Sequence, residues 1–116
     1  MPTTTADVLN LAVTYIERGW LQCRETMQAF AYDAADHPIH PSDSTARRWD
    51  LDGSIRAALY SLCGRFDNDV YDAAIGRVID VVGTRRLGSW NDEPHRTVAE
   101  VIGALQRAAE PTRPIA

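Results

Sequence analysis

The first apolar stretch of the chain repeats with the period of an α-helix. Over residues 4–20, apolar side chains recur every three or four positions, at Val8, Leu11, Ala12, Tyr15 and Ile16. Thr4 stands three residues before Asp7, which is the spacing of a capping box and predicts the start of the helix. Gly19 is predicted to end the helix in the left-handed conformation, with Trp20 folding back onto the last turn.

Three further segments carry helical spacing behind a capping residue. The predicted caps are Asp50 or Asp52 for residues 50–64, Asn68 or Asp69 for residues 68–83, and Thr97, with Glu100 three positions on, for residues 97–110. Gly64 and Gly83 are expected to end the first two of these helices. The predicted buried faces are Ile55, Ala58, Leu59 and Leu62; Val70, Ala74, Val78, Val81 and Val82; and Val98, Val101, Ile102 and Leu105.

The segment between the first two helices has no single period. It fits a helix through Met27, Phe30, Ala31 and Ala34, and it also alternates as a strand through Phe30 and Tyr32. Two prolines within residues 36–43 favour an extended, turning chain, so we expect a small β-hairpin. The predicted fold is mainly α: one compact four-helix domain over residues 1–116, ordered from about residue 4 to residue 110, with this hairpin between helices one and two.

Composition narrows the classes of partner and compartment. The net charge of −4 does not attract polyanions, and all 12 basic residues are arginine. A helix-turn-helix made from residues 50–83 would present Asp69, Asp72 and Asp80 to DNA, so we expect no nucleic acid partner. No apolar run is long enough to span a bilayer. The cysteines Cys23 and Cys63 lack metal or redox spacing, which is typical of a cytoplasmic protein.

Catalytic and metal-binding patterns are weak. Asp36, His37, His40 and Asp43 lie within eight residues, but the intervening prolines keep the segment extended, and a solvated turn is favoured over a metal site. No nucleophile elbow and no phosphate-binding glycine loop is present. We therefore predict no catalytic residue, no metal and no cofactor.

Three tryptophans mark the borders of the predicted helices, each beside polar residues. Such indoles commonly seal the end of a small core, and they also anchor binding surfaces. The candidate binding residues are accordingly Trp20, Gln22, Trp49, Asp52, Trp90, Asn91, Asp92 and Arg96. In the segment 89–100, Trp90 is expected to pack on the core, Asn91 and Asp92 to bond backbone groups, and Arg96 to pair with Asp92 or another acid.

Four segments carry a resemblance to a known family: residues 18–22, 31–43, 47–59 and 89–105. The chain resembles a family of small actinobacterial and actinobacteriophage proteins of unknown function. The matching positions are Gly19, Trp20, Gln22, Trp49, Gly53, Trp90, Asn91, Asp92, Arg96 and Thr97. Asp50 stands where the family pattern has cysteine, and Ser54 where it has alanine, so the resemblance implies no thiol chemistry here.

Two hypotheses of function follow from the sequence. The leading one is a non-enzymatic cytoplasmic protein that binds another protein, encoded by a phage and acting on a host protein, or forms a homodimer. The alternative is a small-ligand-binding or hydrolytic site around Trp90, Asn91, Asp92, His95 and Arg96.

Overall fold

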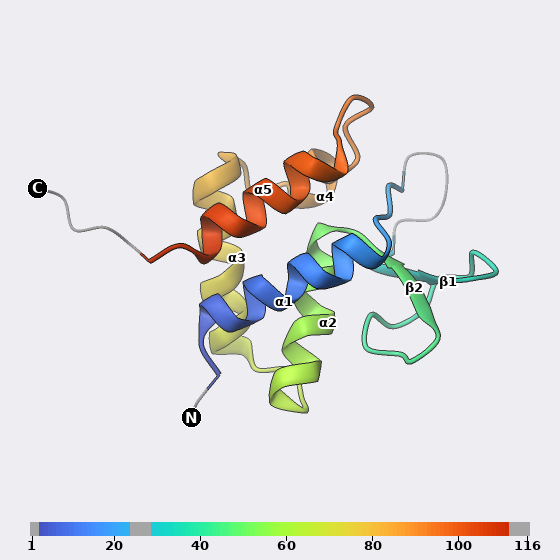
Figure 1. Cartoon of the computed structure of the whole chain (residues 1–116), viewed down its shortest axis with the longest axis horizontal. Coiled ribbons are helices and arrows are strands. Elements are labelled where there is room, and N and C mark those ends of the chain that lie inside the picture. The colour runs from blue at the N-terminus through green and yellow to red at the C-terminus, as the bar shows by residue number, and fades with distance from the viewer. Residues whose placement is uncertain (1–2, 24–28, 112–116) are drawn as a thin grey trace, which may run out of the picture.

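A computed structural model describes residues 3–23 and 29–111 of the chain (Figure 1). This part contains five helices and two strands. In chain order they are α1 (Thr5–Arg18), β1 (Ala31–Asp33), β2 (Ala46–Trp49), α2 (Leu51–Cys63), α3 (Asn68–Val82), α4 (Leu87–Asn91) and α5 (Val98–Ala109). No helix in these ranges is long and apolar enough to cross a membrane.

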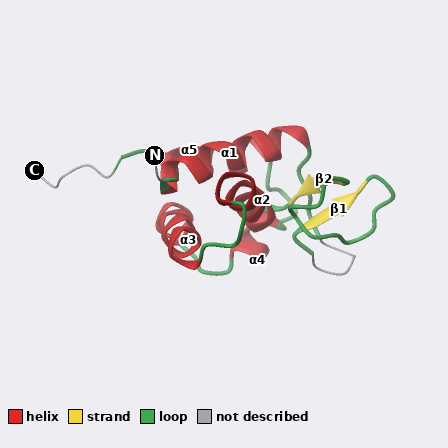
Figure 2. Cartoon of the chain, turned by 90° about the horizontal axis from the view of Figure 1, so that it is seen from below, coloured by secondary structure: helices red, strands yellow, loops and turns green. Residues whose placement is uncertain are grey.

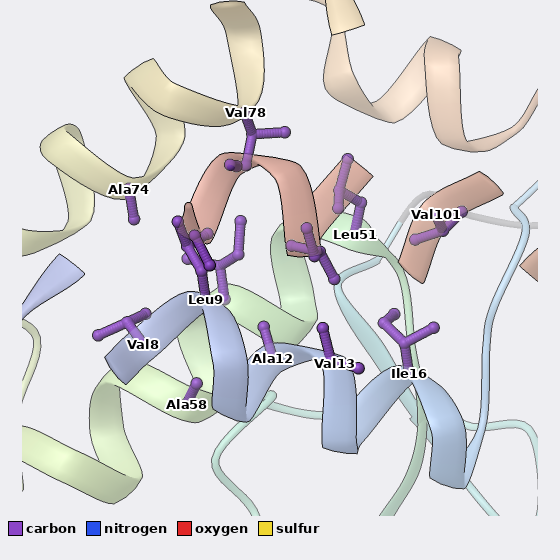
Figure 3. Close-up of a cluster of buried hydrophobic side chains, with 14 of the residues drawn as sticks. Val8, Leu9, Ala12, Val13, Ile16, Leu51, Ala58, Ala74, Val78 and Val101 are labelled. Atoms are coloured by element: carbon purple, nitrogen blue, oxygen red, sulfur yellow. The ribbon is translucent and has the colours of Figure 1, made fainter. Parts of the chain in front are cut away.

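Helix α1 lies at the centre of the core. It begins with the predicted capping box, in which the Thr4 hydroxyl accepts from the Asp7 N–H and the Asp7 carboxylate accepts from the Thr4 N–H. Its buried face contacts α2, α3 and α5. Figure 3 shows the α1 side chains pointing into the space between these helices, where they meet residues such as Leu51, Ala74, Val78 and Val101.

Gly19 ends α1 for a reason that differs from the prediction. Its backbone is extended, with φ −178° and ψ 116°, so the predicted left-handed stop is wrong. The Gly19 carbonyl accepts from the Trp49 N–H at 2.9 Å, which brings the chain against β2. A Cβ on Gly19 would lie 2.2 Å from the Arg47 carbonyl oxygen. Glycine is therefore required by this close approach of two backbones.

The predicted hairpin is a two-stranded antiparallel sheet. Ala31 pairs with Trp49, Tyr32 with Arg48 and Asp33 with Ala46, with an irregular register between Tyr32 and Asp33. Ala31, Ala46, Trp49 and Ala57 form a second small cluster of buried side chains. Figure 2 shows the strands at one end of the molecule and α3 at the other. The alternative helix is excluded at Phe30 to Ala34, and its Met27 lies outside the described residues.

Helices α2 and α3 end at the predicted glycines, but one of the predicted N-caps is wrong. Gly64 and Gly83 adopt the left-handed conformation after α2 and α3. Asp50 caps α2, but the cap of α3 is Asp67, whose carboxylate accepts from the Val70 N–H, instead of Asn68 or Asp69. The predicted burial of Leu62 is also wrong, because its side chain lies on the solvent face near the end of α2.

The predicted four-helix count is wrong, because a short helix, α4, precedes α5. Helix α4 has five residues, little more than one turn, and a helical period of apolar residues cannot be recognised over so short a segment. Helix α5 begins with the predicted capping box of Thr97 and Glu100. Its buried side chains include Val101 and Leu105, whereas Val98, predicted to be buried, is exposed.

Candidate functional site

The described residues line a cleft of about 930 Å³. We refer to it as the α2–α4 cleft. Its walls come from the start of α2, the middle of α3, the α3–α4 connection with α4, and the segments on either side of β1. The lining residues are Ala29, Phe30, Pro38, Ile39, His40, Pro41, Asp50, Asp52, Tyr71, Ile75, Arg85, Arg86, Leu87, Gly88 and Ser89.

Asp50 places a buried carboxyl group in the wall of this cleft. The residue is only 4% exposed, and its Oδ1 accepts a 2.6 Å hydrogen bond from the Gly53 N–H as the cap of α2. Burial raises the pKa of Asp50 to about 8, helped by the nearby carboxylates of Asp52 and Asp92, whereas the bond from Gly53 acts in the opposite direction. At neutral pH this group is therefore mostly a neutral acid that can donate a hydrogen bond.

The Asp52 carboxylate accepts hydrogen bonds from two residues of the same chain, Tyr71 and Arg56. Its Oδ1 accepts from the Tyr71 hydroxyl at 2.8 Å and from Arg56 Nε at 3.0 Å. Burial, together with the Asp52 carboxylate, raises the pKa of Tyr71, so its hydroxyl stays protonated and keeps donating. The Arg56 guanidinium also lies over the rings of Phe30 and Tyr71, 4.1 and 4.8 Å from their centroids. The charge of Asp52 is thus balanced inside the protein.

Arg85 and Arg86 line the cleft from the connection between α3 and α4. Both side chains are exposed. Within residues 3–23 and 29–111, neither guanidinium forms an ion pair or a side-chain hydrogen bond. The positive charge at this end of the cleft is therefore available to an incoming molecule.

Two predicted binding residues of the 89–100 segment, Asn91 and Asp92, lie at a different place, where the Asn91 side chain is the central hydrogen-bonding group. The Asn91 side chain is fully buried. Its Oδ1 accepts from Trp20 Nε1 at 2.8 Å and from the Leu51 N–H at 3.1 Å, and its Nδ2 donates to the Leu21 carbonyl at 2.8 Å and to Asp92 Oδ1 at 2.9 Å. We call these five residues the Asn91 junction. It ties together the chain after α1, the start of α2 and the end of α4.

Gln22 and Cys23 add further hydrogen bonds to the Asn91 junction. Gln22 Nε2 donates to the carbonyls of Asn91 and Glu93 at 3.1 and 2.9 Å, and Asp92 Oδ1 accepts from the Cys23 N–H at 3.0 Å. All these contacts join the segment after α1 to the end of α4. They give Gln22, Asn91 and Asp92 a role in holding the scaffold.

Trp90 and Arg96 form a separate pair. The Arg96 guanidinium lies 3.9 Å from the centroid of the half-buried Trp90 ring, and its Nε donates to the Trp90 carbonyl. The acid that pairs with Arg96 is Glu100, at 3.0 Å. Trp90 and Arg96 border a smaller groove of about 430 Å³ between α3 and α5, while His95 is exposed outside it.

The remaining predicted residues lie apart from that pair. Trp49 is buried at the end of β2, donates to the Pro41 carbonyl at 3.0 Å and packs edge-on against Tyr15. Of the eight predicted binding residues, Asp52 alone lines the α2–α4 cleft. Among the other cleft residues, the sequence predicts Asp50 as a helix cap, but no periodic signal joins it to residues as distant along the chain as Arg85 and Arg86.

The segment of residues 36–43 uses its polar side chains in separate local contacts. Asp36 forms an ion pair with Arg48, His40 Nδ1 lies 2.7 Å from the Ser42 hydroxyl, and Asp43 accepts from the Thr45 N–H. His37 contacts Asp33. In the described ranges, no three histidine, cysteine or acidic side chains are grouped so that they could hold a metal ion.

The fold and its cleft define a small, mainly helical protein with a minor antiparallel sheet and a hollow of ligand size. The chain belongs to the DUF6197 family, a family of unknown function, whose model matches residues 1–111. This confirms the predicted membership of an uncharacterised family; the actinobacterial or phage source stays a prediction. No curated protein and no solved structure matches the chain.

Proposed function

We propose that this protein binds a small molecule in the α2–α4 cleft. The observation that carries the proposal is a buried carboxyl group, Asp50, in the wall of a cleft of about 930 Å³. Small-molecule sites have volumes of roughly 300–1,000 Å³ and combine apolar walls with a few polar groups. Phe30, Ile39, Ile75 and Leu87 supply the apolar wall here, and Asp50, Tyr71 and the two arginines supply the polar groups.

The buried carboxyl group of Asp50 lowers the stability of the folded protein at neutral pH, and this supports a functional role for it. Asparagine or serine caps a helix about as well as aspartate. Burial makes the acid bind a proton that it would release in the unfolded chain, which lowers the stability of the fold at neutral pH. Buried groups with shifted pKa values in clefts are typical of functional sites. We therefore interpret Asp50 as a polar contact for the ligand as well as a helix cap.

The protein-partner hypothesis has weaker support from the described surface. Its exposed large apolar side chains are Phe30 before β1, Leu62 on α2 and Val98 on α5, so no single helix or strand presents more than one of them. A single apolar patch would be the usual feature of a protein-binding face. A protein partner, a homodimer and a cytoplasmic location stay predictions from the sequence.

A fragment screen by protein-observed NMR tests the proposal, with one variant that fills the cleft and one matched control. Ser89 is exposed at the cleft wall, and Ser61 is exposed on α2 outside it. We expect hits whose shift changes cluster on cleft residues, weakened at least tenfold by Ser89→Trp and unchanged by Ser61→Trp. A library without any hit in the cleft, or hits that bind both variants equally, would overturn the proposed function.

A further inference from the structure

The charges around the α2–α4 cleft identify the class of ligand, given the proposed function. Two carboxyl groups, Asp50 and Asp52, and two arginines, Arg85 and Arg86, belong to its lining. Asp52 already holds Arg56 at 3.0 Å, so this pair adds no net charge. Asp50 is mostly protonated at neutral pH because of its burial. The charge left for a ligand is therefore positive, although the whole chain carries −4.

A cationic ligand would find its natural partners occupied. The Asp52 carboxylate and the faces of Phe30 and Tyr71 are the groups that would attract an organic cation. Arg56 already lies over both rings, at 4.1 and 4.8 Å from their centroids, and it forms the ion pair with Asp52. A second cation would have to displace this arginine and would also be repelled by Arg85 and Arg86.

The position of the two arginines has a structural explanation as well. They follow the end of α3, where cations interact favourably with the helix dipole. That effect accounts for basic residues after α3 but not for their place in the cleft lining. Asp80, an acid on α3, borders a different groove with Arg77 and Arg107 and forms no ion pair with Arg85 or Arg86 in the described structure.

We infer that the ligand of the α2–α4 cleft is an amphiphilic organic anion. Its carboxylate or phosphate lies against Arg85 and Arg86, and its apolar body lies along Phe30, Ile39 and Ile75. Arginine suits both kinds of anion, because its planar donors match carboxylate and phosphate oxygens. Asp50 then donates a hydrogen bond to a neutral polar atom of the ligand in the interior of the cleft. This inference rests on the proposed function.

A set of probes with one apolar body and different charges tests the inference. The probes are 2-naphthoate, 2-naphthyl phosphate, 2-naphthamide and 2-naphthylmethylamine, titrated at low salt into the full chain by NMR. We expect both anions to bind about five- to tenfold more tightly than the amide, which is the gain expected from two partly exposed charge pairs. The advantage should shrink at 0.5 M salt because of screening. The tighter of the two anions distinguishes a phosphate from a carboxylate ligand.

A double variant and a control of equal charge locate the anion. Arg85→Gln with Arg86→Gln should remove the preference for anions over the amide. Arg18→Gln with Arg107→Gln changes the net charge equally at two exposed positions outside the cleft lining, and it should leave the preference unchanged. Binding of the amide should be the same in both variants.

The failures of the two proposals can be told apart. Equal binding of anion and amide, tightest binding of the amine, or an anion preference that persists without Arg85 and Arg86 would each overturn the inference. Cleft binding that Ser89→Trp abolishes would leave the proposed function standing in all three cases. Failure of all four probes to bind in the cleft would count against the inference, and the fragment screen then decides the proposed function separately.

Discussion

Replacement of Asn91 by alanine tests whether one buried amide joins three parts of the fold. The Asn91 side chain makes four hydrogen bonds, and three of its partners come from other segments: the Trp20 indole, the Leu51 N–H and the Leu21 carbonyl. The substitution removes the amide but leaves these three groups in place. Because Asn91 is fully buried, water has poor access to the space that is left.

The magnitude follows from the number of groups that lose their partner. A buried polar group without a hydrogen bond costs about 1–3 kcal/mol. Two backbone groups at this cost and a partly buried indole N–H at about 1 kcal/mol therefore cost about 3–7 kcal/mol together. A domain of this size is stable by about 5–15 kcal/mol, so we expect Asn91→Ala to be marginally folded or unfolded at room temperature.

Urea denaturation followed by circular dichroism measures this loss, and two more substitutions separate hydrogen bonding from packing. Asn91→Leu refills the volume without restoring a hydrogen bond, so it should remain destabilised by several kcal/mol. Trp20→Phe removes one donor and should cost about 1 kcal/mol. Asn10→Ala, on the exposed side of α1, should change stability by no more than about 0.5 kcal/mol. Near-native stability of Asn91→Leu would refute the reasoning.

Two further predictions concern the cap of α2 and the end of α1. The pKa of Asp50 is raised to about 8 in the folded protein, so folding favours the protonated carboxyl group. The free energy of unfolding that Asp50 contributes is therefore complete below about pH 4 and is lost as the pH rises to 8. Asp50→Asn keeps a cap but does not titrate. Between pH 5 and pH 8, the free energy of unfolding of the wild-type protein, measured by urea denaturation, should therefore fall by about 1 kcal/mol per pH unit relative to the variant. Parallel pH profiles of the two proteins would contradict the raised pKa of Asp50. Gly19→Ala should lower the melting temperature by several degrees, because its Cβ would lie 2.2 Å from the Arg47 carbonyl oxygen, whereas Gly76→Ala, with no atom within 4 Å, should raise it slightly. Equal melting temperatures for the two glycine variants would contradict the close approach.

The sequence by itself determined the helices with strong local signals. Thr4 with Asp7 and Thr97 with Glu100 form capping boxes because both partners lie within one turn of the chain. The apolar period of residues 8–16 likewise identifies Val8, Ala12 and Ile16 on the buried face of α1, although the prediction left out Leu9 and Val13, which are also buried. The tight stops at Gly64 and Gly83 depend on the local backbone alone, and they were also predictable.

The tertiary structure decided every feature that depends on distant neighbours. Position 19 requires glycine because the backbone of β2 lies against it. Asn91 forms its buried hydrogen bonds because segments about 40 and 70 positions away place their backbone groups around it. Likewise, Asp50, Arg85 and Arg86 line one cleft only because the packing of the helices brings these distant segments together. A period of 3.6 residues reports which side of a helix is apolar, but it carries no information about which element faces that side. The site therefore emerges only when the helices pack.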